Sequence, residues 1–350
     1  MHILWIGKTP ATGNAGDEIF DRKTISALRA ASHTVVTLHP QRVTRWREVA
    51  NLLRGIPHYR SRFASSANQR LVRNAPQDID LTICSWEPLD VLLPHLKRPA
   101  ILIAHNITSQ AITSMFPSSR LARLAAHRAG LWERRLYRAQ TLDAIATLSC
   151  RDHDYVAALA APPRVLLTIP GMPPVLPLDP AAVLRRELVL SGTYDWVPKH
   201  RDVLVFAQDY ARVPNRLPVL AEALPNEALQ FLSPGKAPDD AASQAAIRFG
   251  LITDRFEAGH KLKTLAYIAR NQIVLSFADV SPDFLHIPDH AFFIRRLHSV
   301  DDITTIISNL AGHDPIQLRN RFLCFQRRCA ERFTWCAVAN ALIEGIRPMR

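Results

Sequence analysis

The sequence lacks any apolar run long enough to cross a membrane. A spanning helix needs about 20 consecutive apolar residues, and no stretch of the 350 residues approaches that length. The opening segment His2–Ile6 is apolar but too short for the core of a signal peptide, and a glycine-rich polar segment follows it at once. We therefore expect it to be a first buried strand and not a targeting sequence.

Cysteine is scarce, and its spacing argues against two kinds of site. The five cysteines are odd in number and lack the paired spacing of zinc ligands. We therefore expect neither a disulfide framework nor a zinc site, and this use of cysteine is consistent with a location in the reducing cytoplasm. Internal repeats and low-complexity tracts are also missing. Hydrophobic residues make up 48% of the chain, which is enough for the cores of two domains.

Acidic residues are outnumbered, because 43 lysines and arginines face 31 aspartates and glutamates, a formal net charge of +12. The excess is concentrated between Arg42 and Arg73, where Glu48 is the only acid and aromatic residues lie among the arginines. Such a segment suits an anionic membrane surface, worth about 1 kcal/mol per basic residue close to the lipid. The predicted membrane contacts are Arg45, Trp46, Arg47, Arg54 and Arg60.

Two other interpretations of this basic segment stay open. It could be a solvated basic face, or it could neutralise the phosphates of a nucleic acid. The sequence shows no helix-turn-helix, RNA-recognition or zinc-finger pattern. We therefore rank a membrane above nucleic acid and expect no nucleic-acid partner.

Apolar, β-branched runs alternate with longer helical stretches, which is typical of parallel α/β layers. The predicted strands are 2–6, 34–39, 80–84, 100–104, 143–148 and 165–169, then 187–191, 229–233, 248–252, 272–277 and 292–295. Prolines between Pro173 and Pro180 prevent regular structure. We therefore predict doubly wound domains over 1–172 and 183–330, a linker over 173–182, and a C-terminal helix over 331–350 that packs back towards the first domain.

Three stretches are predicted to be helical. In 121–136, apolar residues recur at Leu124, Leu131 and Trp132, roughly along one face of a helix, which predicts a helix there. Asp301-Asp302 indicates a helix start, where carboxylates meet unpaired backbone N–H groups. The tail from Arg319 onward is predicted to be helical, with one stripe made of Trp335, Val338, Leu342 and Ile346.

Ligands of doubly wound sheets bind beyond the carboxyl ends of the strands, so the residues after each strand are the site candidates. The glycine-rich segment after the first strand matches neither a Walker loop nor a dinucleotide fingerprint. We predict that Gly13 and Asn14 contact an acceptor, while a merely structural turn remains the alternative. Asp17 is a base, a ligand of an acceptor hydroxyl or simply a helix cap.

The fourth predicted strand ends in His105 and Asn106. His105 would emerge at the carboxyl edge of the sheet, where it is a candidate catalytic residue, although a histidine at a strand end is often structural. Asn106 is a candidate acceptor contact. If the chemistry requires a general base, the loop-end candidates are Asp17, Glu87 and His105.

Six short motifs occur in a fixed order along the chain. The pair His105-Asn106 precedes a helical stretch that reads WERRLYRAQTLDAIATLS, and VLLTIPG follows it. In the second half, Ser191–Lys199 reads SGTYDWVPK, Gly259–Leu265 reads GHKLKTL, and Phe333–Trp335 reads FTW. In this order they resemble the motifs of family 4-like bacterial glycosyltransferases, and the matches are spread over most of the chain.

The resemblance implies a GT-B fold, in which two Rossmann-like doubly wound domains face an interdomain cleft and a C-terminal helix crosses over. It implies a hexosyltransferase whose N-terminal domain binds the acceptor and whose C-terminal domain binds a UDP- or GDP-linked sugar. No metal or cofactor is expected, because cations replace the metal at the diphosphate. The residues implied in donor binding are Gly192, Thr193, Lys199, Lys261 and Lys263.

The acceptors common in the resembled family, together with the basic segment, indicate a lipid-linked glycan acceptor in exopolysaccharide or surface-polysaccharide assembly. The protein is then expected to be cytoplasmic and peripheral on the inner face of the cell membrane. The alternatives are a membrane- or nucleic-acid-binding protein without this chemistry, and an NAD enzyme, against which the missing dinucleotide fingerprint counts.

Three positions depart from the family pattern. Ala266 stands where a glutamate usually grips the nucleotide ribose, Lys199 replaces an asparagine, and Thr108 replaces a glutamate. These departures leave open whether the sugar configuration is retained or inverted. Ala266 also favours an alternative function, a non-catalytic GT-B-like binding or partner subunit.

Overall fold

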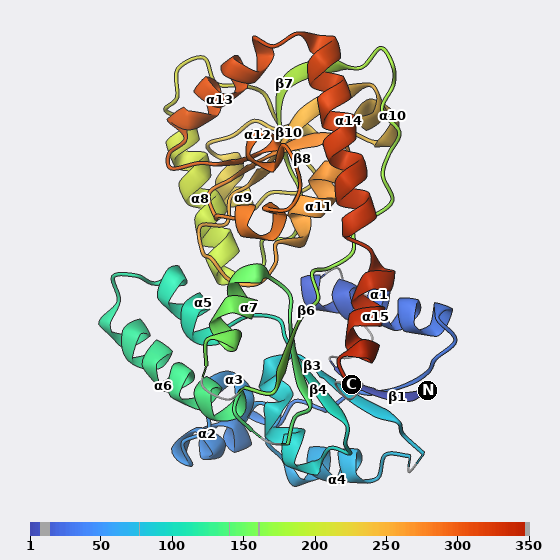
Figure 1. The fold of residues 1–350 in the computed structure, drawn as a ribbon. Helices are drawn as coiled ribbons and strands as arrows, with labels where there is room; N and C mark the ends of the chain where they lie inside the picture. The colour runs from blue at the N-terminus through green and yellow to red at the C-terminus, as the bar shows by residue number, and fades with distance from the viewer. Residues whose placement is uncertain (8–14, 77, 140, 160–161, 347–350) are drawn as a thin grey trace. The chain divides into compact units, whose positions relative to one another are not determined.

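The computed structural model describes residues 1–7, 15–76, 78–139, 141–159 and 162–346. It contains two parallel six-stranded sheets, one in each of two compact units (Figure 1). Unit 1 comprises Met1–Pro170, Ala258–His260 and Trp335–Arg350, and unit 2 comprises Gly171–Glu257 and Lys261–Thr334. The chain thus returns to unit 1 after completing unit 2, as a crossover helix requires.

The sheet of unit 1 has the strand order β2-β1-β3-β4-β5-β6, and all neighbouring pairs are parallel. Its strands are β1 (His2–Ile6), β2 (Thr34–Leu38), β3 (Leu81–Ser85), β4 (Ala100–Ala104), β5 (Ala144–Thr147) and β6 (Arg164–Leu167). The six predicted strands of this half are confirmed to within a residue or two. The direction of winding reverses between β1 and β3, which makes their carboxyl ends a switch point for ligand binding.

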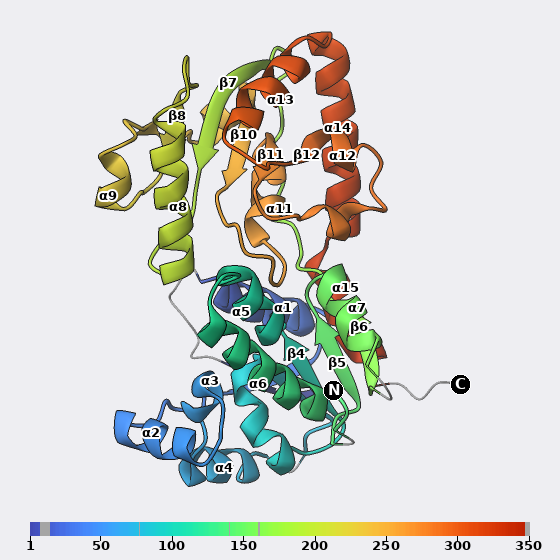
Figure 2. The ribbon, with the colours of Figure 1, turned by 90° about the vertical axis from the view of Figure 1, so that its left-hand side faces the viewer.

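Successive side chains of a strand point to opposite faces of the sheet, and both faces of this sheet are covered. Ile3 and Trp5 of β1 pack in one core with α1 (Gly16–Ala30) and α15 (Trp335–Glu344). Leu4 and Ile6 pack in the other with η1 (Glu87–His95) and its neighbours. Figure 2 shows the sheet of unit 1 with helices on both sides.

The remaining helices of unit 1 are α2 (Arg45–Leu53), α3 (His58–Ser61), α4 (Ser66–Arg73), α5 (Thr108–Met115), α6 (Arg120–Leu136) and α7 (Cys150–Ala157). The predicted helix over 121–136 is confirmed, although two of the apolar residues that marked it lie outside the core. Leu124 and Leu131 are exposed, while Ala129 and Glu133 are buried. Small residues let α6 approach α5 closely, and Glu133 accepts hydrogen bonds from the backbone N and Oγ of Ser109 at the start of α5 (3.2 and 2.5 Å).

The sheet of unit 2 has the order β12-β11-β10-β7-β8-β9, again with parallel pairs. Its strands are β7 (Val183–Leu190), β8 (Val219–Ala221), β9 (Gly235–Lys236), β10 (Ala246–Ile252), β11 (Gln272–Ser276) and β12 (Ile294–Arg296). The winding reverses between β7 and β10. The predicted strand over 229–233 is wrong, because α9 (Asn226–Leu229), which follows Pro225, occupies its start.

The other helices of unit 2 are α8 (Val197–Tyr210), α10 (Asp240–Gln244), α11 (Leu262–Ala269), η2 (Ser281–Phe284), α12 (His290–Phe293), α13 (Asp301–Ala311) and α14 (Pro315–Arg332). The long helix α14 packs against α11 and α12 (Figure 1). There Gln326 Nε2 donates to the Ile268 carbonyl at 2.7 Å. The helix start predicted at Asp301 is confirmed.

Two further predictions concern the joints between elements. The proline-rich segment has no regular structure, as predicted, and it is fastened to unit 2 because Leu176 N donates to the Ala269 carbonyl at 2.8 Å. The predicted C-terminal stripe is confirmed, since Val338 and Leu342 are buried against α1. Within the described residues, no helix is both long and apolar enough to span a bilayer.

Candidate functional site

In unit 2, two predicted donor residues meet where the sheet reverses its winding. Gly192 follows β7 with a φ of 114°, a conformation that favours glycine. A Cβ at this position would lie 2.4 Å from Lys263 Cε and 2.9 Å from Lys263 Nζ. The Lys263 side chain therefore lies directly against the Gly192 backbone. It occupies space that a side chain at position 192 would otherwise fill.

The ammonium group of Lys263 is buried in this site. Its Nζ lies 4.8 Å from the centroid of the Tyr194 ring, and it has no hydrogen-bond partner among the residues that the structure describes. An ammonium carries three N–H donors, and burying them without acceptors is costly. The local environment therefore favours an anionic ligand at Lys263.

Lys261 lies nearby but is held differently. Its Nζ is 3.7 Å from Asp254 Oδ2 and 3.6 Å from the centroid of the Phe256 ring, and its side chain is 10% exposed. Lys261 is the N-cap residue of α11, whereas Lys263 lies in the first helical turn. Lys261 thus already has a counter-ion, and Lys263 is the stronger candidate for binding a ligand anion.

The electrostatics of the site concentrate positive charge. Burial lowers the pKa of Lys261 to about 8; the charges of Lys199 and Lys263 lower it further, while Asp254 opposes them. Burial likewise lowers the pKa of Lys263 to about 8, with Asp254 opposing and Lys199 adding to the shift. The helix dipole of α11 also favours negative charge at this end. An anion bound here would restore full protonation of both lysines.

The structure also adds residues that sequence analysis missed. Tyr194 and Phe256 supply aromatic faces to the two ammonium groups, and Asp254 is a buried carboxylate two residues past the end of β10. A polar residue just beyond a buried strand was the signal that could have identified Asp254. Thr193 is exposed beside Gly192, and Ala266 is half-buried on α11.

In unit 1, three side chains meet at the carboxyl ends of β3 and β4. Ser85 Oγ donates to Asp21 Oδ1 at 2.5 Å and lies 2.9 Å from His105 Nε2, while Asp21 Oδ1 lies 3.9 Å from the same Nε2. Phe20 packs edge-on against the imidazole ring, with centroids 5.3 Å apart. His105 therefore has a defined polar partner, and sequence analysis missed both Asp21 and Ser85.

The neighbouring candidates Glu87 and Asn106 form a second contact. Glu87 is buried, and its Oε1 accepts a hydrogen bond from the Asn106 backbone N at 2.5 Å. Burial raises the pKa of Glu87 to about 8, against the effect of backbone hydrogen bonds and of Arg60. Glu87 thus fastens the turn that carries His105 and Asn106, in a largely protonated state at neutral pH.

The remaining N-terminal predictions have different outcomes. Asp17 lies in the first turn of α1, where its Oδ1 accepts from the Glu18 backbone N at 3.2 Å and its negative charge suits the helix N-terminus, although the N-cap residue itself is Ala15. Gly13 and Asn14, the predicted acceptor contacts, lie outside the described residues. Asp21, one helical turn beyond Asp17, is the carboxylate that the structure places beside His105.

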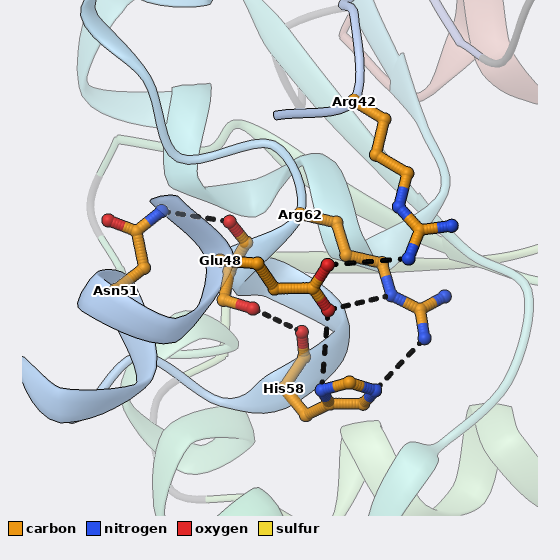
Figure 3. A network of polar contacts seen from close by, with 6 residues as sticks. Arg42, Glu48, Asn51, His58 and Arg62 are labelled. Atoms are coloured by element: carbon orange, nitrogen blue, oxygen red, sulfur yellow. Dashed lines mark hydrogen bonds and ion pairs between the residues drawn. The ribbon is translucent and has the colours of Figure 1, made fainter. Parts of the chain in front are cut away.

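The predicted membrane segment forms α2 and its flanks. Trp46 and Leu53 are 86% and 85% exposed, and the predicted contacts Arg45, Arg47 and Arg54 are exposed beside them. The inner face of α2 is polar, since Glu48 is buried. Figure 3 shows Arg42, Arg62 and His58 converging on Glu48, with nitrogen–oxygen distances of 3.3 to 3.4 Å. Although burial alone would raise it, these cations hold the pKa of Glu48 below its usual value.

Arg60 is a correction to the predicted membrane contacts. Its side chain is completely buried and forms an ion pair with Asp90. Trp132 Nε1 donates to Asp90 Oδ2 at 2.7 Å, and the Trp132 ring lies 5.4 Å from the Arg60 guanidinium. Arg60 therefore neutralises a buried carboxylate and is not available to a membrane. Among the described residues, no group of three or more His, Cys, Asp or Glu side chains is arranged to hold a metal ion.

The fold is shared with known enzymes. No family model and no curated protein matches the sequence. Sucrose-phosphate synthase from Thermosynechococcus elongatus superposes with a TM-score of 0.64 at 15% identity, covering 98% of this chain and 97% of that one. The UDP-forming α,α-trehalose-phosphate synthase from Burkholderia xenovorans gives 0.61 at 11% identity, covering 99% and 98%.

A trehalose-6-phosphate structure from E. coli, bound with UDP-2-fluoro glucose, gives a TM-score of 0.60 at 10% identity and covers both chains completely. These relatives are GT-B glycosyltransferases. At such low identity the similarity is evidence for the fold alone. The full coverage of both chains, with two doubly wound sheets and a returning C-terminal helix, shows that this protein has the GT-B fold.

Proposed function

We propose that the protein is a glycosyltransferase that uses a nucleoside-diphosphate sugar as donor. The observation that carries this proposal is the buried ammonium of Lys263, which lies against Gly192 at the switch point of the second sheet without a described hydrogen-bond partner. The GT-B fold supports it, since the E. coli relative is bound with a UDP sugar.

The chemistry of such a donor matches the charges of the site. Negative charge grows on the diphosphate as its bond to the sugar breaks, and preorganised cations stabilise that charge. We assign the diphosphate to Lys263 first, with Lys199, the backbone around Gly192 and the N-terminus of α11 in support. Lys261 neutralises Asp254 and adds to the positive electrostatic potential at the diphosphate. In this proposal the lysines take the place of a metal ion, and the transferred group is a hexose.

This assignment predicts a particular pH dependence of nucleotide binding. Both lysines are mainly charged below their pKa of about 8 and mainly neutral above it. Binding of UDP or GDP should therefore weaken between pH 7 and pH 9, by up to about tenfold for each lysine that is neutral in the free protein but protonated in the complex. Calorimetric titration of the full chain with UDP and GDP at several pH values measures this.

The same protein is then assayed with a panel of UDP- and GDP-sugars. Failure to bind either nucleotide at any pH would contradict the proposal. Binding without transfer would instead favour the second candidate, a GT-B-like binding subunit, for which Ala266 is the specific observation. Transfer from one donor identifies the sugar, and the product configuration shows whether it is retained or inverted.

We further propose that the acceptor is a lipid-linked glycan and that unit 1 binds an anionic membrane at the cytoplasmic face. The exposed apolar residues of α2 lie one to two helical turns apart, at Trp46, Val49 and Leu53, with arginines beside them. Leu121 and Leu124 of α6 are also exposed, at 81% and 59%. Apolar side chains flanked by arginines suit the interface between lipid headgroups and acyl chains. Exopolysaccharide or surface-polysaccharide assembly would use such an acceptor.

Removing the apolar contacts of α2 is expected to weaken membrane binding. The double variant Trp46→Ala with Leu53→Ala should sediment with phosphatidylglycerol vesicles at least about tenfold less strongly, because each large side chain contributes about 1.5–3 kcal/mol when buried. Leu285→Ala, which removes an exposed leucine of unit 2, is the matched control and should bind as the wild type does. Equal binding by all three proteins, or tighter binding to duplex DNA than to vesicles across a salt series, would contradict the membrane assignment.

A further inference from the structure

We propose that Tyr267 is a positioning residue for the donor diphosphate, because its hydroxyl group joins the carboxyl ends of β7 and β10 and so holds the turn at Gly192 beside Lys263. The proposal rests on the proposed function, in that it assigns the diphosphate to this turn. The link between the two strands stands on geometry. Tyr267 Oη accepts a hydrogen bond from the Ser191 backbone N at 3.0 Å and donates one to the Leu251 carbonyl at 3.0 Å.

This hydroxyl group lies where the two strands stop pairing. β7 and β10 are neighbours in the sheet of unit 2, and the winding of the sheet reverses between them. Their last paired residues are Val189 and Gly250, and Ser191 and Leu251 follow within two residues. Ligands of doubly wound sheets bind at such a reversal, beyond the carboxyl ends of the strands. The tyrosine therefore connects the two backbones at the edge of the sheet where the donor site lies.

Gly250 makes this position of the tyrosine possible. α11 packs on β10 and β11 (Figure 2), and a Cβ at Gly250 would lie 2.3 Å from Tyr267 Cγ, closer than carbon atoms of neighbouring residues approach each other. The ring therefore lies directly on the backbone of β10. Tyr267 and Lys263 are four residues apart on α11, so they share one face of the helix. Each of the two side chains lies against a glycine, Tyr267 against Gly250 and Lys263 against Gly192.

The environment keeps the phenol protonated and both of its hydrogen bonds formed. Tyr267 is buried, and burial raises the pKa of Tyr267 to about 12, against the opposing effect of its hydrogen bonds with Ser191. A neutral phenol has one hydrogen to donate and lone pairs that accept, so a single hydroxyl group serves both strands. Water competes little for these bonds. The turn is thus fixed before a ligand binds, as preorganised stabilisation of a growing negative charge requires.

The variant Tyr267→Phe tests the link, because it keeps the ring on Gly250 and removes only the hydroxyl group. The Ser191 N–H then loses its acceptor, and the turn is no longer held. Calorimetric titration of the full chain should show about tenfold weaker binding of UDP or GDP, the usual effect of losing one hydrogen bond to a charged group. Residue-resolved hydrogen exchange without nucleotide should be at least about tenfold faster at the Ser191 amide than in the wild type.

Tyr210→Phe is the matched control. Tyr210 Oη also accepts from a backbone N and donates to a backbone carbonyl, both of Leu217, at 2.8 and 3.2 Å, and burial raises the pKa of Tyr210 to about 12 as well. Leu217 precedes β8, so this pair lies at the amino edge of the same sheet, away from the donor site. Tyr210→Phe should lower the free energy of unfolding to a similar extent, but leave nucleotide binding and Ser191 exchange unchanged.

Wild-type nucleotide affinity in Tyr267→Phe, or an equal loss of affinity in Tyr210→Phe, would overturn the proposal. So would a Ser191 amide that exchanges in the wild type as fast as the amide of the exposed Thr193, and that result does not depend on whether either variant folds. If the wild type binds neither UDP nor GDP, the proposed function fails. The exchange rates of the three proteins still decide whether Tyr267 holds the turn.

Discussion

Replacing Lys263 with methionine is expected to lower kcat/KM for the sugar donor about 100-fold, the usual effect of removing one preorganised charge donor from a transition state. Methionine keeps the unbranched chain that lies against Gly192 and removes only the ammonium. Because charge on the diphosphate grows as the bond breaks, the loss should fall on kcat more than on the binding of UDP or GDP. Initial rates over a range of donor concentrations separate the two.

Lys261→Met is the informative comparison, since this lysine already pairs with Asp254. Its removal leaves a buried carboxylate without that counter-ion, so we expect a lower free energy of unfolding and a smaller loss of turnover than for Lys263→Met. Lys23→Met removes an exposed lysine of α1 and should change neither quantity. If Lys261→Met lowers kcat more than Lys263→Met does, the leading role belongs to Lys261 and our ranking is wrong.

The donor region shows what the sequence could predict. Gly192 and Lys263 are 71 residues apart, and the family-like motifs assigned both to one donor site; the structure brings the two residues into contact. The different states of the two lysines could not be predicted. They depend on Asp254 and Phe256 lying near one lysine and on Gly192 and Tyr194 lying near the other, which only the folded chain decides.

The fold was predicted where strands are long and buried, and missed where they are short. β8 and β9 have three and two residues, too few for any periodicity to appear. The apolar residues that marked α6 in the sequence do not form its buried face, because Leu124 and Leu131 are exposed and small residues such as Ala129 are buried. Hydrophobic periodicity predicts that a helix forms, but the face that is buried depends on which other elements of the folded chain pack against it.

Arg60 shows that the sequence pattern also does not tell a buried charged residue from an exposed one. Its buried ion pair leads to the second prediction with a large expected effect. The variant Arg60→Met should lose about 3–5 kcal/mol of the free energy of unfolding, the usual result of removing one partner of a buried ion pair. Asp90 would keep its hydrogen bond from Trp132 but lose the cation that pairs with its carboxylate. Urea unfolding of the full chain, followed by circular dichroism, measures the loss in unit 1.

Two variants separate the buried charge from the loss of an arginine as such. Arg62→Met removes one of three basic side chains around Glu48 (Figure 3), so it should cost less than about 1 kcal/mol. Adding Asp90→Asn to Arg60→Met removes the unpaired carboxylate and should recover much of the loss. Equal costs for Arg60→Met and Arg62→Met would show that the buried pair contributes no more than an ordinary surface contact.

The deficit of Arg60→Met should also depend on pH. Burial already raises the pKa of Asp90, against the opposing effect of Arg60, so without Arg60 the pKa of this carboxyl in the folded protein must rise further. The folded variant then takes up a proton that the unfolded chain releases at neutral pH, and its stability falls as pH rises through that range. Towards pH 4, where the carboxyl is protonated in the folded variant and about half protonated in the unfolded chain, the difference from the wild type should shrink. A deficit that stays constant from pH 4 to pH 8 would mean that lost packing, and not an unpaired charge, causes it.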